Sequence, residues 1–196
     1  MRTAPPPLRI GFVPGVEPDR FVRRWRQGPR PAPLELVPLP WSRQLEALAD
    51  GEVDMAFVRL PREHEAADGT DQDRALLADM HAVRLWQERP VVVVSDENVL
   101  SLHEELTEAE LAEEPEIRPE HRDDAKDRIA VVATGVGYTR VPMSLGRLHH
   151  RKDAVLRPLV DADPTTIALV WPRADDDPVR QEFVGVVRGR TIRSTR

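Results

Sequence analysis

Three short apolar segments, separated by two helical patterns, constrain the fold of this chain more than any other feature. Residues 8–13, 34–39 and 53–60 are rich in Leu, Ile, Val and Phe, as strands buried on both faces of a sheet are. Pro18 fits the first position of a helix after the first segment, and Ser42 fits the N-cap of a helix after the second. Strand, helix, strand, helix, strand at this spacing is typical of parallel βαβ units, so the sequence predicts an α/β fold.

Two helices are predicted from different sequence signals, one from an apolar stripe and one from its first residues. The helix after Ser42 is expected to bury Leu45, Leu48 and Ala49 on its inner face. The Asp-Pro pair at 177–178 combines an acidic cap with a proline in the first turn, and therefore begins a final helix.

Weaker patterns continue the alternation of strands and helices. Thr107 and Glu110 have the spacing of a capping box, which predicts a short helix that ends before Pro115. Further helices are expected over 124–134 and 143–148, and further strands over 83–86, 91–94, 138–141, 155–160 and 166–171. We expect a solvated loop or short exposed helix over 61–79 and a frayed tail over 188–196.

Composition narrows the function classes. A chain of 196 residues is long enough to bury a core, and the absence of cysteine excludes disulfides and thiolate metal sites. We find neither a signal peptide nor an unbroken apolar run of about 18 residues, so we expect a cytoplasmic protein without membrane contact. The net charge of −6 does not supply the positive field of a nucleic-acid binder, so DNA is not expected as a direct partner.

Several short motifs occur in an order that resembles one family. They are LRIGF at 8–12, LELV at 34–37, LEAL at 45–48, GEVDMAFVR at 51–59, GVG at 135–137 and VP at 141–142. In this order they resemble the effector-binding domain of LysR-type transcriptional regulators, over most of residues 8–187. The order makes the resemblance specific, because none of these motifs is distinctive by itself.

The resemblance implies a fold and a division of the chain. It implies a type 2 periplasmic-binding-protein-like fold, in which two Rossmann-like α/β lobes are joined by crossover strands and hold an effector between them. Lobe I would comprise residues 1–89 plus 164–196, and lobe II residues 90–163. Two departures accompany it: the family's helix-turn-helix head is not found before the first strand, and the second lobe is shortened between Ile117 and Asp124.

Ligands of open parallel sheets gather at the carboxyl ends of strands, where helix N-termini present backbone amides. The residues predicted there are Pro14, Gly15, Val16, Trp41, Ser42 and Arg59, and the resemblance adds Thr134 and Gly135 from the second lobe. Amides, a hydroxyl and a guanidinium suit a small carboxylate.

Each of the main candidates also has a simpler interpretation. Arg59 can form a surface ion pair worth at most about 1 kcal/mol, and Ser42 can serve only as a cap. Trp41 can be core, and Gly15 can simply allow a tight turn.

Catalytic and metal chemistry is not expected. The chain has no Gly-x-Ser-x-Gly elbow, and Ser144 and His149 lack an evident orienting acid. Adjacent His149 and His150 would point about 100° apart on a helix, unlike an i,i+4 zinc clamp. The GVG motif lacks the third glycine of a dinucleotide fingerprint, so we interpret Gly135 as a helix C-cap. We therefore predict no enzyme activity, no cofactor and no metal.

The sequence thus predicts a stand-alone effector-binding domain that takes a small organic anion and signals through protein contacts. Because relatives pair through a helix of one lobe and a strand of the other, the resemblance implies a homodimer, or a heterodimer with a full-length regulator. The alternative is a dimerisation or interaction module of the same fold that binds no ligand.

Overall fold

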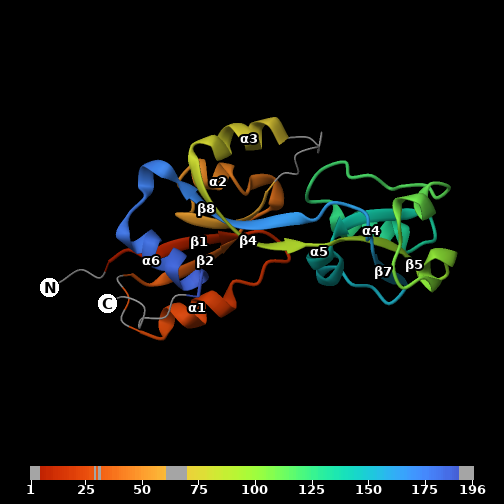
Figure 1. Ribbon diagram of the computed structural model, residues 1–196, viewed down its shortest axis with the longest axis horizontal. Coiled ribbons are helices and arrows are strands. Elements are labelled where there is room, and N and C mark those ends of the chain that lie inside the picture. The colour runs from red at the N-terminus through yellow and green to blue at the C-terminus, as the bar shows by residue number, and fades with distance from the viewer. Residues whose placement is uncertain (1–4, 29, 31, 61–69, 190–196) are drawn as a thin grey trace. The chain divides into compact units, whose positions relative to one another are not determined.

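The computed structural model describes residues 5–28, 30, 32–60 and 70–189, and the chain divides into two compact units (Figure 1). Unit 1 takes the described residues within 1–59, 69–85 and 167–196, and unit 2 takes those within 60–68 and 86–166. The chain leaves unit 1 after Arg59, and it crosses again within strand β4 (Met80–Glu88) and within strand β8 (Thr165–Pro172). The division predicted from the sequence has crossings at residues 90 and 164 and keeps residues 60–68 in lobe I.

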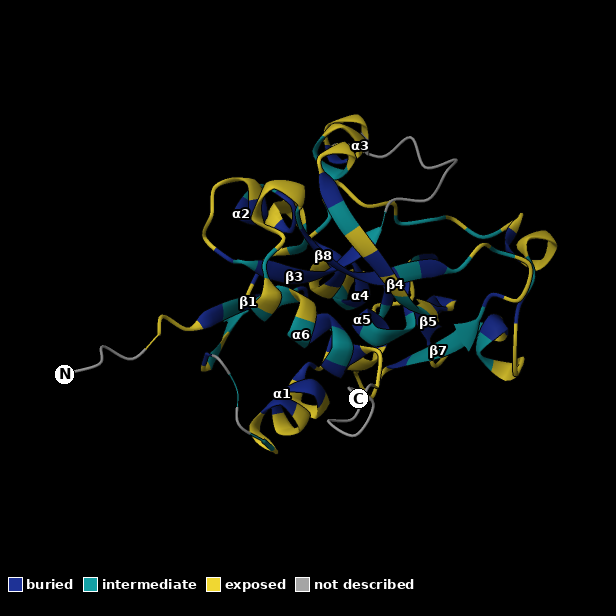
Figure 2. Ribbon diagram, turned by 60° about the vertical axis from the view of Figure 1, so that its left-hand side comes forward, coloured by how far each residue is buried: buried dark blue, intermediate teal, exposed yellow. Residues whose placement is uncertain are grey.

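A five-stranded sheet forms the centre of unit 1, in the order β2-β1-β3-β8-β4. Strand β1 (Leu8–Phe12) pairs in parallel with β2 (Leu34–Pro38) on one side and with β3 (Met55–Leu60) on the other. The middle strand β3 is buried along its length except at its last residue, as Figure 2 shows by its dark colour. Burial on both faces explains why Met55 to Val58 are apolar, whereas Arg59 is a buried charged residue in the same strand. The α/β fold predicted from the first sixty residues is confirmed.

Aromatic side chains fasten the helices of unit 1 to this sheet. The unit contains α1 (Asp19–Arg26), α2 (Glu46–Ala49), α3 (Thr70–Ala78) and α6 (Pro178–Val187). Phe21 of α1 stacks on Phe57 of β3 with 5.2 Å between ring centroids, and Trp25 of α1 meets Phe183 of α6 edge to face at 5.7 Å. These contacts bury the apolar stripe of α1 and leave its arginines exposed.

The segment after β2 differs from its prediction. Ser42 lies inside a 3₁₀ helix, η1 (Trp41–Arg43), whose N-cap position is Pro40, so the prediction of Ser42 as the N-cap is wrong. Helix α2 follows and buries Ala47, whereas Ala49 is exposed instead of buried. A 3₁₀ turn advances the chain by 120° per residue rather than 100°, and this rotates the inner face of the following helix.

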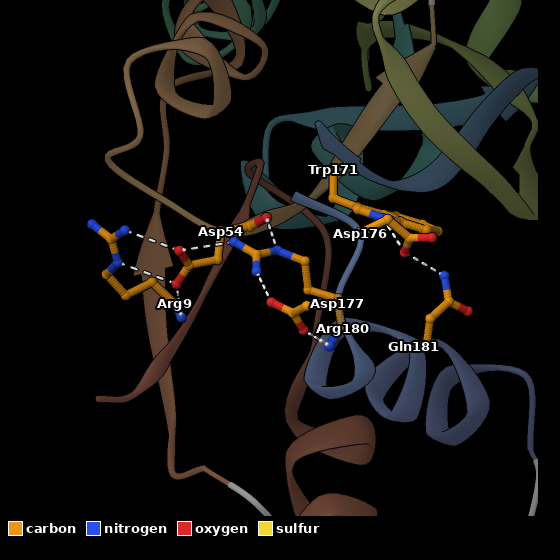
Figure 3. Close-up of polar contacts among 7 residues, drawn as sticks. All are labelled: Arg9, Asp54, Trp171, Asp176, Asp177, Arg180 and Gln181. Carbon is orange, nitrogen blue, oxygen red and sulfur yellow. Dashed lines mark hydrogen bonds and ion pairs between the residues drawn. The ribbon is translucent and has the colours of Figure 1, made fainter. Parts of the chain in front are cut away.

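A polar network fixes α6 to the sheet of unit 1 (Figure 3). The Asp54 carboxylate, just before β3, accepts hydrogen bonds from Nη2 of Arg9 at 3.0 Å and from Nη2 of Arg180 at 3.4 Å. The hydrogen bond with Asp54 raises the pKa of Arg9 and outweighs the small effect of burial. Asp177 accepts the backbone N–H of Arg180 at 2.9 Å and is the predicted N-cap of α6, with proline in the first turn. That prediction is confirmed.

Unit 2 is built on a three-stranded antiparallel sheet in the order β6-β5-β7. All six residues of β5 (Pro90–Ser95) are buried between β6 (Tyr138–Pro142) and β7 (Ala154–Pro158). The unit also holds α4 (Ala125–Val132), α5 (Met143–Leu148) and the 3₁₀ helices η2 (Val99–Leu102) and η3 (Glu108–Leu111). The shortening of this lobe relative to the family stays a prediction.

The capping box is present at the start of η3. The N–H and the hydroxyl of Thr107 both donate to Oε2 of Glu110 at 2.8 Å. These bonds hold the Glu110 carboxylate in its ionised form, and they lower its pKa. The helix that follows is a 3₁₀ turn and ends before Pro115, as the proline predicts.

The remaining predictions have mixed outcomes. Strand β4 extends from Met80 to Glu88, well beyond the predicted residues 83–86. Helix α3 occupies the second half of the predicted loop or helix at 61–79, whose residues 61–69 lie outside the described part of the chain. Of the predicted tail, residues 190–196 also lie outside it. No helix among the described residues is long and apolar enough to cross a membrane.

Candidate functional site

The parallel strands β1 and β2 of unit 1 end level with each other, and β3 continues three residues further, to Leu60. In the register of the sheet, Phe12 of β1 lies beside Pro38 of β2 and beside Phe57 of β3. The segments 14–16 and 41–42 and the side chain of Arg59 follow these positions within a few residues. The candidate residues of unit 1 therefore come together at the carboxyl edge of the sheet, where open α/β sheets bind ligands.

The first of these segments is a tight turn. Gly15 has a φ of 83°, which side chains other than glycine rarely adopt, and the N–H of Val16 donates to the carbonyl of Val13 at 3.2 Å. The N–H of Val13 in turn donates to the carbonyl of Phe57 at 3.2 Å, so the turn starts at the last contact between β1 and β3. Helix α1 begins four residues after Gly15, with its amino end on this side of the sheet. The simpler interpretation of Gly15 as a turn residue is correct, and it still leaves the backbone of the turn at the sheet edge.

Trp41 and Arg59 form a pair at the same edge. The Arg59 guanidinium carbon lies 5.2 Å from the centroid of the Trp41 ring, within the range of a cation–π contact. Arg59 is only 1% exposed, whereas Trp41 is half-buried and Ser42 is exposed. A guanidinium held in a buried position acts at a lower effective dielectric constant than one in water, so it attracts an anion more strongly.

Gln44 belongs to this edge and was not singled out from the sequence. Its side chain is 1% exposed and makes two hydrogen bonds with the backbone of Arg59. Nε2 donates to the Arg59 carbonyl at 2.8 Å, and Oε1 accepts the Arg59 N–H at 2.9 Å. The helical pattern of this region carries no signal for it, because a glutamine between Trp41 and Leu45 fits either face of a short helix.

Thr134 and Gly135 lie at the end of α4 in unit 2. The Thr134 hydroxyl donates to the carbonyl of Val131 at 2.7 Å, and the N–H of Gly135 donates to the carbonyl of Val132 at 3.0 Å. The C-cap of α4 is Ala133, so the interpretation of Gly135 as the C-cap is wrong by two residues. Gly135 has a φ of 92° and reverses the chain just after the helix. Both residues are exposed on unit 2. Their part in ligand binding stays a prediction.

Unit 2 carries a separate open pocket of about 380 Å³. Its lining is strongly charged and consists of Glu108, Leu111, Ala112, Glu114, Glu116, Arg118, Tyr138 and Arg140. Partial burial opposes the charge of Arg140, but hydrogen bonds with Tyr138 and Glu108 and the nearby Glu116 raise its pKa. The two arginines of the pocket, Arg118 and Arg140, are thus already paired with carboxylates of the same pocket.

The residues considered for catalysis, Ser144 and His149, belong to unit 2. His149 follows α5, and partial burial together with the charge of Lys126 lowers its pKa, so the neutral imidazole is favoured. Over the described ranges, no group of three or more His, Cys, Asp or Glu side chains is placed to hold a metal ion.

Comparisons with known proteins give the family and the fold. A family model described as the LysR substrate binding domain matches residues 4–130. A search of curated proteins finds no match. The structure is similar to the BenM effector binding domain with its effector benzoate, with a TM-score of 0.68 and 19% identity over 95% of this chain and 92% of that one. It is also similar to a mutant OxyR regulatory domain from Pseudomonas aeruginosa, with a TM-score of 0.65 and 17% identity over 99% of this chain and 100% of that one.

A longer protein matches the same part of this chain. A mutant OxyR from Corynebacterium glutamicum has a TM-score of 0.66 and 19% identity over 93% of this chain, which spans 62% of that protein. At these identities the likenesses establish the fold, which is the two-lobed, type 2 periplasmic-binding-protein-like fold that the sequence predicts.

Proposed function

This chain belongs to the LysR substrate binding domain family, and on that premise we propose that it binds a small organic anion at the carboxyl edge of β1, β2 and β3. The observation that supports the proposal most is the convergence of the Gly15 turn, Trp41 and Arg59 at one edge of a parallel sheet. Residues Pro14, Val16 and Ser42 complete the proposed contacts.

The chemistry of this edge favours a carboxylate. The amino end of α1 presents backbone N–H groups and partial positive charge, and a small anion fits such an end. Arg59 adds a full positive charge that can bind a carboxylate with two parallel hydrogen bonds. Trp41 offers an apolar ring surface for the body of the ligand. The BenM effector domain, which has the same fold, takes benzoate as its effector, and benzoate is an anion of this kind.

The burial of Arg59 sets a condition on binding. Since its side chain is 1% exposed, an anion reaches the guanidinium only if some of the groups that cover it move aside. Binding is then coupled to a local rearrangement, as a sensor requires.

A thermal-shift screen of small organic carboxylates, with benzoate and succinate among them, tests the proposal. A ligand present at about 100 times its Kd stabilises the folded protein by about 2.7 kcal/mol and raises the Tm. The shift should disappear in Arg59→Ala and persist in Arg23→Ala, which removes an exposed arginine of α1. A carboxylate that stabilises both variants equally would remove Arg59 from the site, and a panel without any hit would favour an interaction module that binds no ligand.

We propose further that the domain does no chemistry and signals through protein partners in the cytoplasm. The bound carboxylate should be recovered unchanged by NMR after long incubation. Light scattering should show a homodimer, or a complex with a full-length LysR regulator when the two are mixed. The net charge of −6 is unfavourable for phosphate contacts, so gel-shift assays with duplex DNA should show no complex.

A further inference from the structure

We infer that Gln44 is a positioning residue for the proposed anion site, because its carboxamide holds the backbone of Arg59 in place beside Trp41. The inference rests on the proposed function for its consequence in ligand binding. Its structural part, the control of Arg59 by Gln44, can be tested without any ligand.

The need for such a residue arises where β1 stops pairing with β3. The register of the two strands runs from Ile10 beside Met55 to Phe12 beside Phe57, and one further hydrogen bond joins the Val13 N–H to the Phe57 carbonyl. After that point β1 turns away. Buried N–H and C=O groups need partners, so the end of β3 requires a substitute for the strand that has left.

The side chain of Gln44 supplies that substitute. A carboxamide carries an NH₂ donor and a carbonyl acceptor, so it can replace the N–H and C=O of a peptide unit, and both groups bond to Arg59, at 2.8 Å and 2.9 Å. The side chain is 1% exposed, so water is not at hand to replace either bond if the amide is removed. The Arg59 backbone is therefore fixed at the position where the guanidinium is needed.

Gln44 also connects Arg59 to Trp41. Its own backbone N–H donates to the Trp41 carbonyl at 3.3 Å, which closes the η1 turn. One residue thus holds the backbone on each side of the pair whose guanidinium and ring lie 5.2 Å apart. Since a binding site works only when its groups are held in the productive geometry, loss of the Gln44 amide should weaken binding through Arg59.

Two variants distinguish the contributions of the donor and the acceptor of the Gln44 amide. Gln44→Met keeps the length of the side chain and removes both hydrogen bonds, whereas Gln44→Glu keeps an acceptor and loses the donor. Gln72→Met is the matched control, because Gln72 is exposed and its amide donates to the Glu46 side chain rather than to backbone, at 3.0 Å, within the described part of the chain.

The first readout is hydrogen exchange of the Arg59 amide, followed by NMR in the ligand-free protein. Gln44→Met should speed exchange of the Arg59 amide by about tenfold or more relative to neighbouring β3 amides, and Gln44→Glu should speed it by less. The control should leave it unchanged. If Gln44→Met does not fold, Gln44→Glu decides by the same measurement. Equal protection of the Arg59 amide in wild type and in the folded Gln44 variants would overturn the inference.

The second readout is the Kd of benzoate, or of the tightest carboxylate found in the screen. Gln44→Met should weaken binding by about tenfold. In an Arg59→Ala background, with the carboxylate concentration raised until its weaker binding is measured, Gln44→Met should have no further effect, because Gln44 acts through Arg59. Independent, multiplying effects would contradict a positioning role. If no carboxylate binds the wild type, the proposed function fails, and fast exchange of the Arg59 amide in Gln44→Met would still show that Gln44 fixes this residue.

Discussion

Gly135 and Gly137 form a natural pair for testing how unit 2 is held together. Both have positive φ values, 92° and 62°, so an added side chain strains the backbone of each by about 1–2 kcal/mol. They differ in their surroundings. A Cβ at Gly135 meets nothing within 4 Å, but a Cβ at Gly137 would lie 1.9 Å from the carbonyl oxygen of Pro115, which is part of the backbone and cannot rotate away.

The collision at Gly137 also breaks hydrogen bonds. The Tyr138 N–H donates to that Pro115 carbonyl at 2.9 Å, and the Ile117 N–H donates to the Tyr138 carbonyl at 2.7 Å. Moving the Pro115 segment to admit a methyl group loses both, at about 1 kcal/mol each. We therefore expect Gly137→Ala to lower the free energy of unfolding by about 3–4 kcal/mol and Gly135→Ala by about 1 kcal/mol.

Urea denaturation followed by circular dichroism measures both values on the same protein. The slope of unfolding free energy against urea should stay the same in the two variants, so that the change in midpoint reports stability. Equal losses for the two glycines would refute the reasoning, because φ strain alone would then account for both.

Three further predictions concern single side chains. Asp124→Asn should destabilise the protein by about 3 kcal/mol in urea denaturation, since it leaves the buried Arg128 guanidinium without the carboxylate that it contacts at 2.6 Å; the exposed Asp163→Asn is the control and should change little. Asp177→Ala should cost about 1 kcal/mol, the value of a lost N-cap, and an unchanged Tm would contradict the role of this residue. Burial and the charge of Lys126 lower the pKa of His149 in the folded protein, so the unfolded chain binds a proton at His149 first as the pH falls below about 6.5, and stability should decline below that pH. A series of Tm values from pH 8 to pH 5 should lack that part of the decline in His149→Gln.

The parts of the fold that the sequence predicts best are those that local chemistry decides. The start of α6 depends on an aspartate and a proline next to each other, and both act within one turn. The capping box at Thr107 is equally local and is present, although the helix that it begins is a 3₁₀ turn. The strands β1 and β3 of unit 1 are predictable because most of their residues are apolar, as burial in the sheet requires, and Arg9 and Arg59 are the charged exceptions.

The failures lie where tertiary contacts decide between local alternatives. Ser42 has the right type for a cap, but the chain forms a 3₁₀ turn through it, with Trp41 beside Arg59 and Gln44 bonded to the end of β3. Ala49 fits an apolar stripe and still faces solvent, because that turn rotates the next helix. Hydrophobic periodicity cannot predict these contacts, because the two partners of each lie fifteen residues or more apart along the chain.

The connection of unit 2 between Ile117 and Asp124 is held by hydrogen bonds of polar side chains. The Asp124 carboxylate accepts the N–H of Glu120 at 2.7 Å, and the Thr139 hydroxyl donates to the carbonyl of Ile117 at 2.8 Å. Arg128 bonds to both Asp124 and Thr139, so it joins α4, β6 and the connection.

Burying such an ion pair has a large desolvation cost and by itself does little for stability. The ion pair contributes specificity instead, because its hydrogen bonds are directional. Apolar contacts would let a connection of this length shift over the sheet, whereas charged and hydroxyl groups with fixed partners permit one arrangement. Unit 2 therefore depends on three polar side chains, Asp124, Arg128 and Thr139, for the arrangement of this connection. Replacing any one of these side chains should loosen the connection while β5 stays folded. Hydrogen exchange should then become faster at the Glu120 amide, in the connection, and stay slow at the Val93 amide, in β5.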